Sequence, residues 1–195
     1  MSALFKSALA QAELLNRRQI SAVELMQDTL ARIKTINPQV NAIISLREEA
    51  DLLVQAAQAD KSSRTGWMHG LPIAIKDLHD VKDMPSSMGS AIFADYIAEK
   101  DDIAVARVRA AGAIIIGKTN TPEFGLGSHT YNPVHGTTYN PYDLSKSAGG
   151  SSGGAAAALS TRMLPLADGS DMMGSLRNPA AWNNVYGFRP SFGLV

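Results

Sequence analysis

The sequence has no cysteine among its 195 residues, and this absence removes several classes of chemistry at once. Without cysteine there is no disulfide scaffold, no thiolate nucleophile and no cysteine-ligated zinc or iron–sulfur site. The 18 basic residues balance 18 acidic ones, so the formal net charge is zero. A neutral chain carries no electrostatic signature of a nucleic-acid or anionic-membrane partner. We therefore expect no nucleic acid and no membrane as partners, and neither a cofactor nor a metal.

Charged residues and long apolar runs are also scarce. Charged side chains make up 18% of the sequence, below the roughly 25% usual for globular domains, which suggests a surface partly covered by something else. The longest aliphatic run, Ala113 to Ile116, is far too short to span a bilayer. The N-terminus lacks the apolar core of a signal peptide. Because cysteine and an export signal are both missing, we predict a cytoplasmic protein.

The first third of the chain has the pattern of three helices. Apolar side chains near one face define the first helix: Leu4, Leu9, Ala12 and Leu15. Ser21 and Glu24 form a capping box at the start of the second helix, which we expect to stop at Asn37-Pro38. A third helix is predicted from Glu48 to about Asp60.

Strands and helices then alternate. Short apolar segments over 41–46, 71–75 and 113–116 indicate strands, and a helix ending at Gly112 precedes the last of them. Strand, helix and strand at this spacing predict an α/β fold class. Residues 120–155 are dominated by Gly, Ser, Thr, Asn and Pro, but their aromatic side chains argue against disorder.

Two familiar motifs match literally and do not fit their context. Gly112 to Thr119 satisfies the P-loop pattern, but its four variable positions are a β-branched run that is itself a strand, so we interpret it as a strand followed by a turn. Gly149 to Gly153 matches the Gly-x-Ser-x-Gly elbow, whose mechanism needs a histidine after the serine. All four histidines precede Ser151. We expect them to be structural or surface residues.

A third constellation joins a lysine with two serines. Lys76 follows an apolar strand, Ser151 lies in Gly-Gly-Ser-Ser-Gly-Gly, and Ser175 lies in Met-Met-Gly-Ser-Leu-Arg. A hydroxyl needs a base to become a nucleophile, and a poorly solvated lysine can be neutral near pH 7. The flanking glycines allow close approach of the backbone. The alternative, a solvated lysine beside ordinary turns, stays open at this point.

At these residues the sequence resembles the amidase signature family, and the resemblance covers nearly the whole chain. The segments that carry it are 70–77, 117–125, 147–154 and 171–180. The resemblance implies a mixed central β-sheet flanked by helices, apparently truncated because family members are more than twice as long. It also implies one domain over 1–195, with a helical lead-in over 1–66 and a catalytic core over 67–195.

The resemblance also implies roles for individual residues. Ser175 would attack the amide carbonyl, Ser151 would relay the proton beside a cis peptide bond after Gly150, and Lys76 would be the base. Backbone N–H groups would form the oxyanion hole, from Met172, Met173, Gly174 and Ser175. Supporting residues would be Ser152, Asp171 and Arg177, with Arg177 holding the backbone rather than the substrate.

One departure from the family lies in the loop of the expected nucleophile. Met173 stands where family members commonly carry glycine. A side chain there requires an ordinary backbone conformation and would narrow the pocket, or else it would serve simple packing.

The sequence thus predicts an amidase-type hydrolase that cleaves the C–N bond of a small-molecule amide through an acyl-enzyme. The alternatives are a catalytically silent truncated fragment and an amidotransferase A-subunit-like partner. The expected partners are a second copy of the chain or a complementing C-terminal half.

Overall fold

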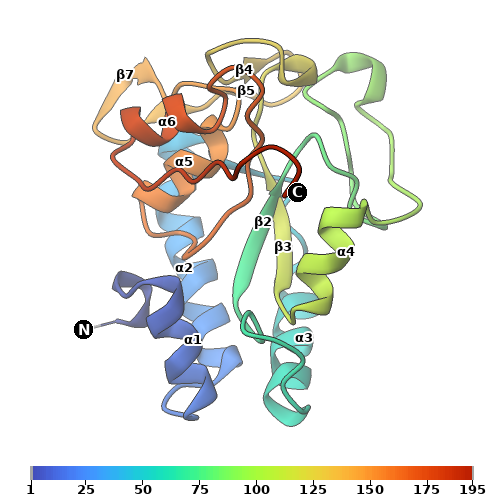
Figure 1. Cartoon of the computed structure of the whole chain (residues 1–195), viewed down its shortest axis with the longest axis vertical. Helices are drawn as coiled ribbons and strands as arrows, with labels where there is room; N and C mark the ends of the chain where they lie inside the picture. The colour runs from blue at the N-terminus through green and yellow to red at the C-terminus, as the bar shows by residue number, and fades with distance from the viewer. Residues whose placement is uncertain (1, 195) are drawn as a thin grey trace.

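The computed structural model describes residues 2–194, which form helices around a small central sheet (Figure 1). The helices are α1 (Ala8–Asn16), α2 (Ala22–Val40), α3 (Glu49–Lys61), α4 (Ile103–Ala110), α5 (Gly153–Ser160) and α6 (Arg177–Trp182). The central strands are β1 (Ile43–Ile44), β2 (Pro72–Lys76) and β3 (Ile114–Thr119). Two further strand pairs follow, β4 (Tyr131–Asn132) with β5 (Gly136–Thr137), and β6 (Tyr139–Asn140) with β7 (Asp143–Ser147).

The central sheet is mixed and has helices on both faces, as the sequence predicts. Its strand order is β1-β3-β2, with β1 antiparallel and β2 parallel to β3. Ile73 and Ile75 pack with Val105 of α4 on one face. Ala74 and Ile116 pack on the other face with apolar side chains of α2, α3 and α5. Figure 1 shows β2 and β3 in the centre, with α4 to the right and α2 to the left.

The second helix begins as predicted but ends later. The Ser21 hydroxyl accepts from the Glu24 N–H at 3.0 Å, and the Glu24 carboxylate accepts from the Ser21 N–H at 2.8 Å, which completes the capping box. The expected stop at Asn37-Pro38 is wrong, because Pro38 lies inside α2. In the last turn a proline removes a single helical hydrogen bond, and the helix ends instead at Val40, with Asn41 at φ +50° as its C-cap.

The first helix is also divided. Residues Ala3–Phe5 form a 3₁₀ turn, and α1 starts separately at Ala8. The break occurs at Ser7, whose backbone is extended and whose hydroxyl accepts from the Ala10 N–H at 3.3 Å. A serine that caps a helix must leave the helical conformation itself, so Leu4 and Leu9 belong to different elements.

The loop-rich region is held by buried amides. The Asn132 side chain donates to Asn120 Oδ1 at 2.8 Å, and the Asn120 side chain donates to Thr138 Oγ1 at 3.0 Å. These three polar residues are buried. Buried and mutually bonded amides fix a single conformation, which accounts for order in a segment with little regular secondary structure.

Because of a register irregularity between β2 and β3, the buried side chains of Lys76 and Lys118 lie on opposite faces of the sheet. Ile73 pairs with Ile115, but Ala74 pairs with Gly117, so Ile116 is an extra residue in β3. After this bulge Lys118 pairs with Ile75 and therefore faces the α4 side. The segment that matches the P-loop pattern is thus mainly a strand, as we interpreted it.

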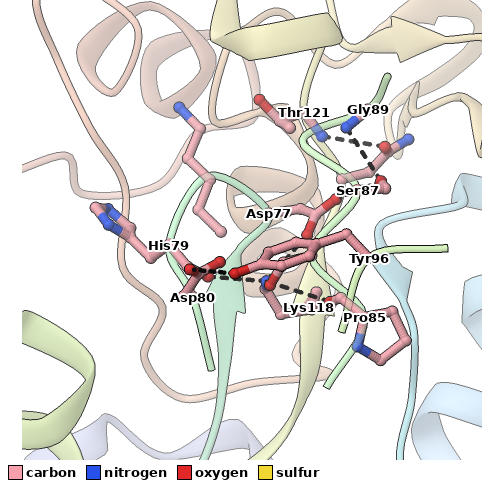
Figure 2. Close-up of polar contacts among 12 residues, drawn as sticks. Asp77, His79, Asp80, Pro85, Ser87, Gly89, Tyr96, Lys118 and Thr121 are labelled. Atoms are coloured by element: carbon pink, nitrogen blue, oxygen red, sulfur yellow. Dashed lines mark hydrogen bonds and ion pairs between the residues drawn. The ribbon is translucent and has the colours of Figure 1, made fainter. Parts of the chain in front are cut away.

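Lys118 is fully buried and pins the turn that follows β2 (Figure 2). Its Nζ lies 2.9 Å from Asp77 Oδ1 and donates to the His79 carbonyl at 2.8 Å and to Ser86 Oγ at 3.0 Å. The other Asp77 oxygen accepts from Ser87 Oγ at 2.7 Å. This network fixes the backbone immediately after Lys76.

Within residues 2–194, no helix combines the length and the apolar character needed to cross a membrane.

Asp77→Ala tests the buried ion pair, because it leaves the Lys118 ammonium buried without its carboxylate. We expect the free energy of unfolding in urea to fall by about 3–5 kcal/mol. The matched control is Glu13→Ala, which breaks an ion pair with Arg17 whose two side chains are 51% and 64% exposed, and should cost far less because solvent screens an exposed pair. Equal losses in the two variants would contradict the assignment.

Candidate active site

Lys76 ends β2 with its side chain fully buried and surrounded by serine hydroxyls. It lies two residues after Ala74 and therefore faces the α5 side of the sheet. Its Nζ donates to Ser151 Oγ at 2.7 Å, to Ser152 Oγ at 2.9 Å and to Ser170 Oγ at 2.9 Å. These three neutral oxygens satisfy the three N–H bonds of an ammonium.

This surrounding lowers the proton affinity of the lysine. Burial lowers the pKa of Lys76 to about 8, while the charges of Asp168 and Asp171 act in the opposite direction. Hydroxyl oxygens stabilise an ammonium less than water or a contacting carboxylate would, so the neutral amine becomes accessible. At mildly alkaline pH Lys76 can therefore accept a proton.

Ser151 and Ser152 come to the lysine because a glycine-rich turn leads into α5. The peptide bond between Gly150 and Ser151 is cis, as expected from the family resemblance. A Cβ added to Gly153 would lie 2.3 Å from Thr130 Oγ1, and one added to Gly154 would lie 2.3 Å from the Asn120 N atom. These glycines therefore allow the turn to lie directly against the preceding loop.

The segment with Ser175 lies beside the same turn. The Ser175 carbonyl accepts from the Ser152 N–H at 2.9 Å. Gly174 before it has φ +108°, and a Cβ there would lie 2.7 Å from the side chain of Asn178. No hydrogen bond joins the Ser175 and Ser151 hydroxyls in the part of the chain that the structure describes. Such bonds are often absent in unliganded sites and form when the substrate binds.

The Asp171 carboxylate holds the loop that contains Ser175 by accepting hydrogen bonds from its backbone. Its side chain is 2% exposed and accepts from the backbone N–H groups of Gly174 at 2.8 Å, Leu176 at 3.3 Å and Arg177 at 3.2 Å. The Arg177 guanidinium adds two bonds, at 2.9 and 3.1 Å. The guanidinium, together with these backbone donors, holds the pKa of Asp171 well below its usual range. Arg177 thus contacts the loop, as the sequence analysis expects.

The loop offers fewer free backbone donors than the sequence suggests. The Gly174 N–H is occupied by Asp171, so it is not available to a substrate oxygen in this structure. The N–H groups of Met172, Met173 and Ser175 have no acceptor within residues 2–194. The donor set expected for an oxyanion is therefore reduced by one, because the carboxylate that shapes the loop uses that group itself.

The two methionines do not pack in the core. Met172 is 80% exposed and Met173 is 84% exposed, so the packing alternative is wrong. The backbone of Met173 stays outside the left-handed region, as a side chain requires. Both side chains project from the loop that contains Ser175, where they can contact a molecule that binds at Ser175.

Two residues at the lysine were missed by the sequence analysis. The uncharged Ser170 hydroxyl contacts Nζ, and Asp168 Oδ1 accepts from the backbone N–H of Lys76 at 2.7 Å. Asp168 follows the apolar run 163–167 just as Lys76 follows 71–75. The position of a polar residue at the end of an apolar segment is therefore a signal that Asp168 shares with Lys76.

The histidines serve other contacts, as predicted. His69 binds the Ala59 carbonyl at 2.9 Å, His135 lies 3.0 Å from Ser87 Oγ, and the ring of His129 packs near Trp182. His79 lies nearer the site, with Nε2 3.9 Å from Asp168 Oδ2. Across residues 2–194, no group of three or more His, Asp or Glu side chains is placed to hold a metal ion.

Comparisons with known proteins agree with this architecture. The family profile described as Amidase matches residues 24–195. The A subunit of glutamyl-tRNA(Gln) amidotransferase from Coxiella burnetii is 46% identical over 184 residues, which are 93% of this chain and 38% of that protein. The chain thus spans about 38% of the length of these curated relatives.

Solved structures give the same result. A bacterial aryl acylamidase of the amidase signature enzymes superposes with a TM-score of 0.90 at 34% identity, covering 97% of this chain and 40% of that one. The A subunit of glutamyl-tRNA(Gln) amidotransferase from Thermotoga maritima gives a TM-score of 0.83 at 34% identity, covering 100% and 40%.

Asp171→Asn tests the role of this carboxylate in the loop. At pH 7 we expect the free energy of unfolding to fall by about 2 kcal/mol, because a neutral amide cannot replace the charge-assisted bonds. The folded-state pKa of Asp171 is depressed, so its contribution is present above the unfolded value of about 3.9 and is lost as the pH falls below it. The difference between the proteins, measured by urea unfolding, should shrink below about pH 4. A difference that stays constant with pH would contradict the assignment.

Proposed function

The chain belongs to the amidase family, and we propose that it hydrolyses the C–N bond of a small amide with Lys76, Ser151 and Ser175. The observation that carries the proposal is the 2.7 Å contact between the Lys76 amine and the Ser151 hydroxyl in a buried, carboxylate-free shell. Within residues 2–194, the Lys76 Nζ forms no ion pair that would explain its burial. Burial lowers the pKa of Lys76, which is the property that a base acting near neutral pH requires.

In the first half of the reaction Ser175 Oγ attacks the amide carbonyl carbon. Its proton passes to Ser151 Oγ while the Ser151 proton passes to the neutral amine of Lys76. The resulting oxyanion is held by the free N–H groups of the loop, at Met172, Met173 and Ser175. Removing one such donor costs about 3 kcal/mol in other hydrolases.

The intermediate then collapses and the C–N bond breaks. Lys76 returns the proton through Ser151 to the leaving nitrogen, which departs as a neutral amine. Ser175 is left as an acyl ester. A water molecule attacks this ester with its proton taken by the same relay, and the carboxylic acid leaves as Ser175 is restored. Lys76 thus acts as base and acid in turn.

Transfer of the acyl or amide group is a second candidate function. It is supported by the 46% identity to a protein named as the A subunit of a glutamyl-tRNA(Gln) amidotransferase. The same acyl-enzyme would then form from a carboxamide, the released ammonia would pass to an acceptor held by another polypeptide, and water would hydrolyse the acyl ester to restore Ser175. Such a polypeptide partner is also supported by the exposure of Tyr186, Phe188 and Leu194, which are 86%, 66% and 74% exposed.

Ser175→Ala tests the nucleophile. The unaltered chain should release the chromophore of a simple aryl amide and should form a covalent adduct with a fluorophosphonate, detected by its mass increase. Ser175→Ala should lose both, and the exposed neighbour variant Met172→Ala should keep the adduct. No turnover and no adduct in the unaltered chain would favour the catalytically silent alternative, while transfer of the amide nitrogen of glutamine to an acceptor other than water would favour the amidotransferase alternative.

The pH profile tests the base. Because the neutral amine is the active form and burial places the pKa of Lys76 at about 8, kcat/KM should rise with pH and level off above that value. Lys76→Arg keeps a cation that cannot lose its proton and should be inactive at every pH. A profile that is flat from mildly acidic to alkaline pH would sink the assignment of lysine as the base.

A further inference from the structure

One short segment contacts Lys76 at both ends of the residue. Asp168 Oδ1 accepts from the Lys76 backbone N–H at 2.7 Å, and Ser170 Oγ accepts from its Nζ at 2.9 Å. The two residues are separated by one position, so in an extended chain their side chains leave on the same side. The segment 168–170 therefore holds both the backbone and the amine of Lys76 by hydrogen bonds.

The carboxylate of Asp168 accepts a backbone N–H on the outer edge of β2. β2 is an edge strand, and the Asp77 N–H points to β3, where it donates to the Thr119 carbonyl at 3.1 Å. The preceding N–H, that of Lys76, must therefore point away from the sheet. It meets the Asp168 side chain. A neutral amide oxygen could accept this bond equally well, so the bond alone does not explain a carboxylate here.

The negative charge of Asp168 acts on the amine of Lys76. The charged groups around Lys76 are Asp168 and Asp171 on the loop side and the Asp77–Lys118 pair on the opposite face of the sheet. Asp171 is committed to Arg177 and to backbone donors of its loop. Asp168 instead faces the lysine and a single histidine, His79, at 3.9 Å.

We propose that Asp168 is a positioning residue for Lys76, which it holds through the backbone N–H while its negative charge keeps the amine protonated to higher pH. This inference rests on the proposed role of Lys76 as the base. Asp168 then sets the lower pH limit of the reaction without touching substrate.

The direction of the effect follows from electrostatics. Burial raises the pKa of the Asp168 carboxyl, while the hydrogen bond from the Lys76 N–H and the nearby side chains of His79, Lys76 and Lys118 oppose this. The Asp168 side chain is 24% exposed, so water reaches the carboxylate and, with the Lys76 N–H, stabilises its charged form. Removing that charge must make the neutral amine available at lower pH.

The experiment is a direct titration of Lys76 in the full 195-residue chain. Lysine labelled with ¹³C and ¹⁵N reports each amine by NMR, and the Lys76 signal is identified by its loss in Lys76→Met. Asp168→Asn keeps the shape and the oxygen that accepts the backbone bond but removes the charge. We expect the titration midpoint of Lys76 to fall by about one pH unit. An unchanged or higher midpoint would overturn the proposal.

The matched control is Asp102→Asn. Asp102 also accepts a backbone N–H, that of Asp80 at 3.1 Å, and also contacts His79, but it does not contact Lys76. Its exchange should leave the Lys76 midpoint unchanged. An equal fall in both variants would mean that loosening of the loop, rather than the charge of Asp168, moves the lysine, and would overturn the proposal.

A second variant covers the case in which Asp168→Asn does not fold. Asp168→Glu keeps the charge, so the Lys76 midpoint must stay at or above that of the unaltered chain, and a fall would contradict the proposal. The titration needs no turnover. Failure of the proposed function appears in the amide assay, whereas failure of this inference appears only in the NMR midpoint. In an active chain the rising limb of kcat/KM should move to lower pH together with that midpoint.

Discussion

The burial of the Lys76 amine among three serine hydroxyls is the interaction on which the rest of the site depends. An ammonium removed from water needs three acceptors, and here they come from two separate segments, the start of α5 and the segment after Asp168. Because these acceptors are neutral, burial is not offset by a contacting carboxylate, and the pKa of Lys76 falls to about 8. Strand, helix start and loop must all be in place before the lysine has this property.

Small residues make this arrangement sterically feasible. The helix α5 starts with Gly153-Gly154 and continues with four alanines, all of them buried. This helix contacts all three strands of the central sheet. A larger side chain at its first turn would collide with Thr130 or with the backbone at Asn120, and the two serines before it would be displaced from the lysine.

The same chain buries a second lysine under opposite conditions. Lys118 lies 2.9 Å from the Asp77 carboxylate and donates to a backbone carbonyl, whereas within residues 2–194 the Lys76 Nζ donates to hydroxyls. The two lysines share a small sheet but face opposite sides of it, since the extra residue Ile116 changes the face on which Lys118 lies. One lysine therefore holds the turn after β2 through an ion pair, and the other donates to neutral hydroxyls, which suits the base that we propose. Residue type alone does not distinguish them.

The sequence by itself determined the α/β class, the capping box at Ser21, the strand character of the false P-loop, and the three motifs that contain Lys76, Ser151 and Ser175. These features depend on local patterns of apolar, glycine and hydroxyl residues, which are legible along the chain. Only the tertiary structure decided that Ser170 and Asp168 contact the lysine, that Asp171 occupies the Gly174 N–H, and that Met173 is exposed. The contacts of Asp168 and Ser170 join segments 92 or 94 residues apart, the Gly174 N–H is decided by competition for a single donor, and the exposure of Met173 depends on what packs around its loop. No local pattern encodes any of these.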